Sequence, residues 1–432
     1  MIKNPLRLIP PLISVILLTA TVFLTAQSNT YIPTATETST VTSQLTSQTI
    51  SKPTTASQSE KSTPTEETEE VRAVWIPFMT LDMGGTDRSE KAFQEKIDAI
   101  MDNCSAKNFN TIFVHVRPFG DAIYPSQYYP WSHIISGTQG QAPDYDPLEY
   151  IVQSAHQHNL KIHAWVNPLR VRYNQTPSVL SEDNPHNLWK NDDTDKNDDY
   201  IVEYENGIYY NPAYPEVRKY IINGILEIVE NYAVDGIHFD DYFYPTENAD
   251  FDQTAYDNYC QSVDDTAEPL TLIEWRKSNI NALIAGVYSS VHSVRDDIVF
   301  GISPQGNIEN DELMCADVTQ WCCVQGYIDY ICPQIYVSNS HPILPFSDTA
   351  ARWRSVVTYD EIQLYGGLGL YKAGTDADEG TWLKSNEEIK TQIETVRELG
   401  FDGFALYSYE YLETPQTAQE IQNVMALLNQ SD

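Results

Sequence analysis

The sequence predicts an α/β protein: a (β/α)8 TIM barrel preceded by a signal or anchor segment and a disordered Ser/Thr-rich linker. Two observations predict the barrel. The composition changes abruptly at Val71, and an alternation of strand-like and helix-like segments runs from there to the end. Eight of these segments read as strands, each followed by a helix or a helix-length stretch. A doubly wound open sheet usually has fewer strands and a glycine-rich first turn, which this sequence lacks.

Eight short segments are predicted strands. They are residues 72–78, 111–116, 161–167, 236–240, 299–303, 330–336, 363–370 and 403–409. Amphipathic stretches between them predict helices at residues 90–107, 147–158, 215–232, 272–294, 348–358, 386–399 and 417–428. A weaker helical stretch at residues 311–324 precedes the sixth strand.

Side chains alternate along three consecutive strands in the way that barrel closure requires. One set is apolar and suits packing under helices, whereas the other is polar or aromatic and is expected to point into the barrel. The inward set is predicted to be Phe113, His115 and Arg117 on the second strand, His163, Trp165 and Asn167 on the third, and His238 and Asp240 on the fourth.

The first 70 residues predict that the protein is exported and that a linker precedes the folded domain. Lys3 and Arg7 precede an apolar run, so residues 1–26 are expected to be a signal peptide or a membrane anchor. Residues 27–70 are rich in Ser and Thr with few large apolar side chains, which predicts a disordered linker. Residues 71–432 then form the barrel. The protein is therefore expected to be extracytoplasmic, either secreted or held at the cell surface.

The composition narrows the choice of partners. The formal net charge of −35 argues against nucleic acid and against anionic membrane surfaces, so membrane contact is expected only through an uncleaved N-terminal segment. The acidic run at residues 191–199 is better explained as a solvated loop than as a calcium site. Six cysteines show no zinc-ligand spacing, and they fit buried thiols as well as disulfides. Neither a metal nor a cofactor is predicted.

The most informative stretch is residues 235–245, where the fourth strand stops at two adjacent carboxylates. Asp240 and Asp241 lie at the C-terminal tip, where barrel enzymes place their chemistry. Two acids this close should have different pKa values, and one could act as a general acid. Strand parity points Asp240 inward, while Asp241 points inward only if the strand has ended. The alternative is a buried ion pair of Asp240 with Arg117 or His238, with Asp241 capping the turn.

Aromatic residues gather in the predicted loops at the same end. Sugar rings stack on aromatic faces, and their hydroxyls need amide and charged partners, so the set favours a carbohydrate ligand. Loop packing is the better explanation for any single ring. The set is Tyr124, Tyr128, Tyr129, Trp131, Tyr242, Phe243, Tyr244, Tyr336, Trp382, Tyr407 and Tyr409.

A zinc site is the competing interpretation. His115, His163 and His238 are expected inside the barrel near Asp240, and such a set could hold zinc. His163 is expected to lie a layer deeper than His238, however. Core histidines hydrogen-bonded to their neighbours are therefore favoured over metal ligands.

Seven ordered motifs resemble the bacterial glycosyl-hydrolase-like family 10. They are RAVWI at residues 72–76, FVHVRP at 113–118, HAWVNP at 163–168, NP at 211–212, DGIHFDDY at 235–242, GISP at 301–304 and YICPQIY at 330–336. The double-Asp strand is also similar to one in a related family of poly-N-acetylglucosamine hydrolases. The resemblance implies a barrel that cleaves cell-wall glycan of the peptidoglycan type or another N-acetylhexosamine glycan, with the bacterial cell-wall polymer as partner.

The expected roles follow from the strand ends and from this resemblance. Catalysis is expected at Asp240 and Asp241, with Glu410 as a third carboxylate. Substrate binding is expected at Arg117, Trp165, Asn167, His238, Tyr242, Gln334, Tyr336 and Tyr407. A non-catalytic wall-glycan-binding protein on a hydrolase scaffold and a metal-dependent hydrolase stay open as alternatives.

Overall fold

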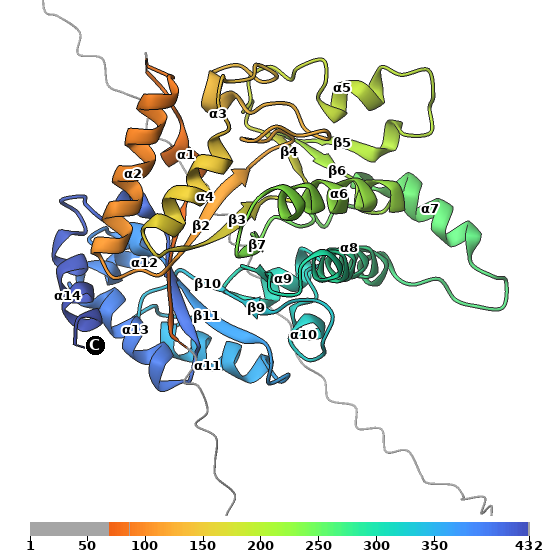
Figure 1. Cartoon of the computed structure of the whole chain (residues 1–432). Helices are drawn as coiled ribbons and strands as arrows, with labels where there is room; N and C mark the ends of the chain where they lie inside the picture. Colours follow the sequence, from red (N-terminus) through yellow and green to blue (C-terminus); the bar gives the residue numbers. More distant parts are fainter. Residues whose placement is uncertain (1–68, 86, 431–432) are drawn as a thin grey trace, which may run out of the picture. The chain divides into compact units, whose positions relative to one another are not determined.

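Parallel strands pair side by side around a closed barrel (Figure 1). The order is β10-β11-β12-β1-β2-β3-β7-β8-β9, and β9 also pairs with β11, which closes the ring. The strands are β1 (Val71–Ile76), β2 (Thr111–Arg117), β3 (Lys161–Val166), β7 (Gly236–Phe239), β8 (Val299–Ile302), β9 (Tyr330–Ile331), β10 (Gln334–Ile335), β11 (Gln363–Leu368) and β12 (Gly403–Leu406). The predicted (β/α)8 barrel is confirmed.

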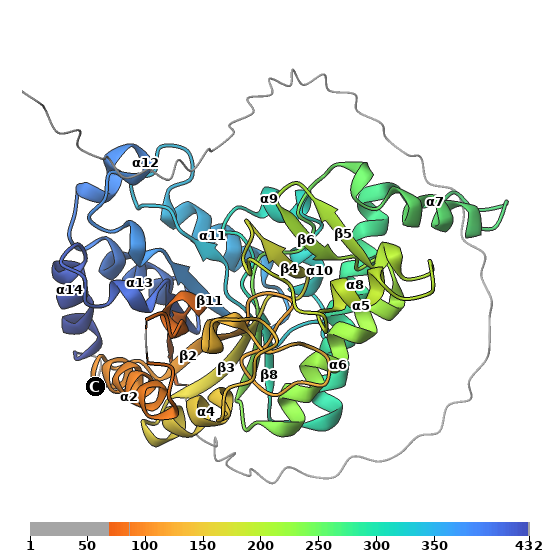
Figure 2. The ribbon, with the colours of Figure 1, turned by 90° about the horizontal axis from the view of Figure 1, so that it is seen from above.

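This computed structural model describes residues 69–85 and 87–430, so the expectations for residues 1–26 and for most of the linker lie outside the described residues. Helices surround the strands, as Figure 2 shows from above. The principal ones are α2 (Glu90–Ala106), α4 (Pro147–Gln157), α6 (Pro215–Asn231), α8 (Leu272–Val294), α11 (Phe346–Val356), α13 (Glu388–Glu398) and α14 (Ala418–Leu428). Their starts follow local chemistry: Thr271 and Glu274 form a capping box at α8, and α4 and α6 begin with proline.

The sixth predicted strand is split. Residues 330–336 form β9 and β10 with Cys332 and Pro333 between them. Proline has no N–H to donate to the ladder, so the pairing is interrupted there. The weaker helical stretch before it is also two short helices, α9 (Ile308–Leu313) and α10 (Val318–Trp321), rather than one.

A small antiparallel sheet lies within the segment between β3 and α6. Its order is β4-β6-β5, built from β4 (Arg170–Tyr173), β5 (Ile201–Tyr204) and β6 (Gly207–Tyr210). The sequence predicts neither a strand nor a helix between residues 167 and 215. The remaining helices are α1 (Phe78–Leu81), α3 (His133–Ser136), α5 (Pro185–Lys190), α7 (Gln253–Ser262) and α12 (Ala377–Gly380), with 3₁₀ turns η1 (Asp198–Tyr200), η2 (Ala249–Phe251), η3 (Leu370–Lys372), η4 (Thr381–Leu383) and η5 (Tyr409–Tyr411).

Two apolar layers hold the barrel together. The outer face of the strands packs under the helices in one continuous core. The barrel interior is a separate aromatic cluster of Ala73, Trp75, Phe113, Trp165, Tyr330, Cys332, Tyr365 and Ala405. A Cβ on Gly301 of β8 would lie 2.2 Å from the Tyr330 ring, so only glycine lets that ring lie across the strand.

Arg117 does not point into the barrel, and this part of the parity prediction is wrong. The register between β2 and β3 shifts between His115 and Arg117, which puts Arg117 opposite the outward-facing Val166. Its guanidinium carbon lies 4.2 Å from the centre of the Tyr129 ring. A Cβ on Gly224 of α6 would come within 2.7 Å of its Nη1 atom. The side chain therefore lies between β2 and α6.

Three further findings concern the described residues only. None of their helices is long and apolar enough to cross a membrane. All six cysteines fall within this part of the chain and are free thiols. No group of three or more His, Cys, Asp or Glu side chains in it is arranged to hold a metal ion.

Candidate active site

Asp240 and Asp241 follow the last residue of β7, so the strand ends before both of them. Asp240 is 2% exposed, and its Oδ2 atom accepts hydrogen bonds from Trp165 Nε1 at 3.0 Å and Asn167 Nδ2 at 3.3 Å. Its Oδ1 atom accepts the backbone N–H of Tyr242 at 3.4 Å. Asp240 is thus held by neutral donors, not by the ion pair that the sequence left as the alternative, and it is Asp240 that caps the turn.

The environment of Asp240 favours its protonated form. Burial and, to a smaller extent, the neighbouring charge of Asp241 together raise its pKa to about 7. The positive charge of Arg170 and the hydrogen bond from Trp165 act in the opposite direction. Near neutral pH this carboxyl therefore exchanges a proton readily.

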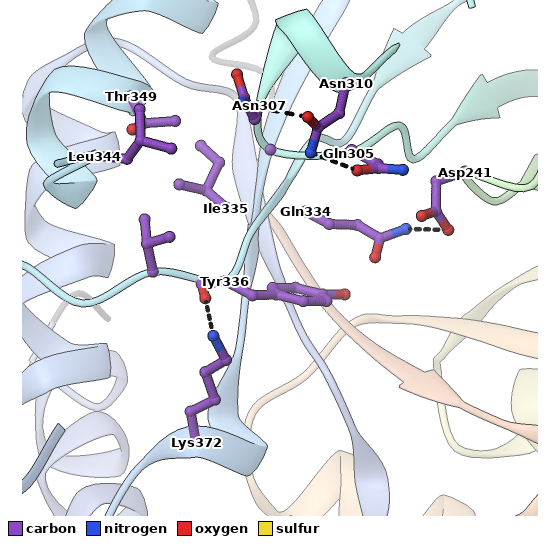
Figure 3. A pocket seen from close by; sticks show the side chains of 12 residues that line it. Asp241, Gln305, Asn307, Asn310, Gln334, Ile335, Tyr336, Leu344, Thr349 and Lys372 are labelled. Atoms are coloured by element: carbon purple, nitrogen blue, oxygen red, sulfur yellow. Dashed lines mark hydrogen bonds between the residues drawn. The ribbon is translucent and has the colours of Figure 1, made fainter. Parts of the chain in front are cut away.

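Asp241 is half-buried and faces open space. Its Oδ1 atom accepts a hydrogen bond from Gln334 Nε2 at 3.1 Å. Burial raises the pKa of Asp241, and the bond from Gln334 lowers it. Figure 3 shows this pair at the edge of a pocket. A second pocket lies against the same carboxylate.

The first pocket, here called the amide pocket, has a volume of about 410 Å³. Its polar wall carries side-chain amides from the loop after β8, from α9 and from β10, and Lys372 lies across from them (Figure 3). The lining residues are Asp241, Gln305, Gly306, Asn307, Asn310, Gln334, Ile335, Tyr336, Val337, Leu344, Thr349 and Lys372.

The loop after β8 is fixed in place by buried partners. Asp311 Oδ1 accepts the backbone N–H of Gln305 at 2.9 Å, and burial raises the pKa of Asp311 to about 9. Trp353 Nε1 donates to the carbonyl of Gly306 at 2.8 Å. A Cβ on Gly306 would lie 2.4 Å from the carbonyl oxygen of Gln334, so the loop meets β10 closely. The amide pocket is therefore preformed.

The second pocket, here called the aromatic pocket, has a volume of about 220 Å³. Tyr242 is 51% exposed, and the guanidinium carbon of Arg170 lies 4.4 Å from its ring centre. Tyr173, on the small antiparallel sheet, is 44% exposed. The lining residues are Arg170, Tyr173, Tyr209, Asp241, Tyr242, Phe243, Tyr244, Pro245, Gln305 and Met314.

Of the other expected site residues, some line the two pockets and some lie behind the residues that do. Tyr336 lines the amide pocket, and its ring centre lies 5.6 Å from that of Tyr407. Glu410 lies in η5, where its Oε2 atom accepts a hydrogen bond from Ser408 Oγ at 2.5 Å. Glu410 and Tyr407 line neither pocket beside Asp241. Trp165 and Asn167 act on the site through Asp240.

His238 lies deeper, in a hydrogen-bonded chain. Trp75 Nε1 donates to His238 Nε2 at 3.0 Å, and Tyr330 Oη lies 2.8 Å from the Nδ1 atoms of both His238 and His163. Since Nε2 of His238 accepts, its proton is on Nδ1 and donates to Tyr330, which donates in turn to His163. Burial lowers the pKa of both histidines, that of His163 to about 4. For these two, the hydrogen-bonded core that the sequence favoured is confirmed.

For His115 the prediction of a hydrogen-bonded core histidine is wrong, because neither of its buried ring nitrogens has a partner among the described residues. Its ring is stacked on Trp165 with centres 3.6 Å apart and is buried. The stacking supports the indole whose N–H reaches Asp240.

Sequence reasoning missed several residues of the two pockets, chiefly Arg170 and Gln305. Both follow strand ends closely, which is the signal that could have found them. Gln305 comes directly after the GISP motif, and Arg170 comes three residues after Asn167. The Oδ1 atom of Asn167 accepts the backbone N–H of Arg170 at 2.9 Å, which fixes the turn between them.

Several known proteins are similar to this chain. The family described as glycosyl hydrolase-like 10 matches residues 70–384. The glycosyl hydrolase YngK of Bacillus subtilis is 33% identical over 352 residues, which are 76% of this chain and 66% of YngK, just under two thirds of its length. The glycosyl hydrolase DigH of Escherichia coli K12 is 32% identical over 381 residues, which are 81% of this chain and 83% of DigH.

Solved structures share the fold at much lower identity. The glycoside hydrolase domain of PgaB (BpsB) from Bordetella bronchiseptica aligns with a TM-score of 0.54 and 12% identity, covering 82% of this chain and 98% of that domain. An endo-1,4-β-mannanase from Rhizomucor miehei aligns with a TM-score of 0.52 and 10% identity, covering 84% and 95%. At such identities the likeness shows the fold alone.

Proposed function

Because the chain belongs to the glycosyl hydrolase-like 10 family, we propose that it is an extracytoplasmic glycosidase. Its proposed substrate is a cell-wall glycan of the peptidoglycan type or another glycan that contains N-acetylhexosamine. One observation carries the proposal: two adjacent carboxyl groups at a strand tip, both with raised pKa values, beside two pockets lined by amides and aromatic rings. This arrangement suits acid/base cleavage of a glycosidic bond.

The two carboxyl groups have different surroundings and therefore different proposed roles. Asp241 lines both pockets, so it is the group that protonates the leaving oxygen. Asp240 is buried beside it and held by Trp165 and Asn167. In its ionised form, which a pKa of about 7 leaves populated near neutral pH, it either attacks the anomeric carbon or steadies a substrate 2-acetamido group that attacks instead.

Sugar recognition is assigned to side chains that reach the pockets. Tyr242 offers an exposed ring face, and Gln334 and Tyr336 line the amide pocket next to Asp241. Tyr407 and Glu410 follow β12, and the Tyr407 ring packs against Tyr336. No sugar contact is proposed for Arg117, which lies between β2 and α6, or for His238, whose ring nitrogens are bonded to Trp75 and Tyr330.

The test is glycan cleavage by carboxamide variants of the full chain. Asp240→Asn and Asp241→Asn are each expected to lower the rate of release of new reducing ends by about 10²–10⁴-fold, because the first removes the attacking or steadying carboxylate and the second removes the proton donor. Both peptide-free and peptide-bearing wall glycans serve as substrates. Asp348→Asn, on the exposed side of α11, is the matched control and should keep full activity.

Other outcomes would assign the protein to a different class. Turnover close to that of the unmodified protein in both variants would contradict the proposal. Glycan binding without new reducing ends would indicate a non-catalytic wall-glycan-binding protein, since a hydrolase fold alone does not give activity. Activity lost on chelation, with a metal that copurifies, would indicate a metal-dependent hydrolase.

A further inference from the structure

We propose that this site cuts internal bonds of its glycan, with the amide pocket and the aromatic pocket binding the sugars on opposite sides of the scissile bond. The inference rests on the proposed function and goes further than it. It concerns where along the glycan the enzyme cuts and which residues bind the sugars on each side of the cut.

The position of the proposed acid is the first reason. Asp241 and Gln305 line both pockets, so the two spaces meet at the carboxylate. A group that protonates the leaving oxygen must lie between the two sugars that the bond joins. Pockets of about 410 and 220 Å³ on its two sides leave room for sugars in both directions. An enzyme that removes terminal units instead needs a site closed on one side.

The aromatic pocket has the chemistry of a stacking platform. Arg170 lies against the Tyr242 ring at 4.4 Å and so fixes its orientation, yet half of the Tyr242 side chain stays exposed. Arg170 is itself anchored, because its Nε atom donates to the carbonyl of Pro118 at 3.1 Å. Tyr173 adds a second exposed ring. An immobilised ring loses little freedom when a sugar stacks on it.

The amide pocket has the chemistry of hydroxyl and acetamido recognition. Gln305, Asn307 and Asn310 each carry N–H donors and a carbonyl acceptor. Gln334 donates its two N–H groups to Asp241 and to the Ser303 carbonyl, so it offers its carbonyl oxygen as an acceptor. Asn310 Nδ2 donates to Gln305 Oε1 at 3.0 Å, so the two amides hold each other in position (Figure 3). The two pockets therefore bind sugars by different contacts, and each contributes separately to where the glycan sits.

Product length tests internal cleavage directly. The full chain is incubated with peptide-free peptidoglycan glycan strands labelled at the reducing end, and labelled products are sized while most strands are still uncut. Internal cleavage is expected to give labelled fragments of many intermediate lengths. Release of only mono- or disaccharides from one end would overturn the inference and leave the proposed function standing. If no new reducing ends form, the proposed function fails as well.

Two variants test whether the two pockets bind sugars on opposite sides of the scissile bond. Size-fractionated, end-labelled fragments of the cleaved strands are digested by Tyr242→Ala and by Asn310→Ala. Weaker binding on one side of the acid shifts the bound fragment toward the other side. The two variants should therefore move the main cleavage position in opposite directions, each changing the product ratio by about fivefold for the loss of one favourable contact.

A general folding defect would not produce opposite shifts. Gln422→Ala removes an exposed amide on α14, outside both pockets, and should keep the original cleavage pattern. Shifts in the same direction, or no shift in either variant, would overturn the assignment of the two pockets.

Discussion

At the scale of single residues, Asp240 links catalysis to stability. Its folded-state pKa of about 7 lies above the usual value of 3.8, so the folded chain binds this proton more tightly than the unfolded chain. The stabilisation is fully present below pH 3.8 and is lost as the pH rises toward 7. Above that range the folded state holds a buried, ionised carboxylate.

Asp240→Asn should therefore become more stable relative to the unmodified protein as the pH rises. The difference in free energy of unfolding is expected to grow by up to about 1.4 kcal/mol per pH unit between pH 4 and 7 and then to level off. Denaturant unfolding at several pH values measures it. A difference that stays constant from pH 4 to 8 would contradict the raised pKa.

Two arginines show how far residue-level prediction reaches. Parity correctly places Phe113 inside the barrel but fails for Arg117, because a register shift intervenes and the sequence carries no mark of it. Arg170, which affects the pKa of Asp240 and stacks on Tyr242, lies beyond the predicted strand. Its place depends on the local turn that Asn167 fixes and on the tertiary contact of its Nε atom with the carbonyl of Pro118.

At the scale of elements, Gly301 on β8 makes room for the ring that orders the barrel interior. Gly301→Ala would put a Cβ 2.2 Å from the Tyr330 ring, whose hydroxyl joins His163 and His238. The free energy of unfolding is expected to fall by about 1–3 kcal/mol, as overpacking does in other cores.

Gly286→Ala on α8 is the matched control. Its new Cβ would meet only the end of the Ile222 side chain within 3 Å, and that end can rotate away. Alanine in a helix interior is about 0.5–1 kcal/mol better than glycine, so this variant should be unchanged or slightly more stable. Equal losses in the two variants, measured by denaturant unfolding, would show that the Tyr330 contact is not the cause.

Predictability also differs among elements. Long amphipathic helices and alternating strands are visible in the sequence because burial imposes their period. The four-residue strands β4, β5 and β6 are too short for that signal, and Pro333 divides a strand that its neighbours suggested was continuous. The walls of both pockets come from such irregular segments. The sequence therefore locates the carboxylates better than the spaces around them.

At the scale of the whole molecule, the first and last strands of the barrel meet where β1 pairs with β12. Arg397 on α13 donates through Nε and Nη2 to the two carboxylate oxygens of Glu70, at 2.6 and 2.7 Å. Asn110 Nδ2 also donates to the Glu70 carbonyl at 2.9 Å. The residue just before β1 thus joins segments from both ends of the barrel sequence.

Two truncations test the Glu70 contacts and the predicted domain boundary together. Fragment 66–432 keeps Glu70 and is expected to fold and to retain the activity of the full chain. Fragment 71–432 loses the Glu70 contacts and should be less stable by about 1 kcal/mol, the scale of a partly exposed ion pair. Glu70→Gln in the longer fragment should reproduce much of that loss, because it breaks the pair but keeps the backbone contact with Asn110. Equal unfolding midpoints for all three proteins would show that the Glu70 contacts add no stability to the junction of β1 and β12.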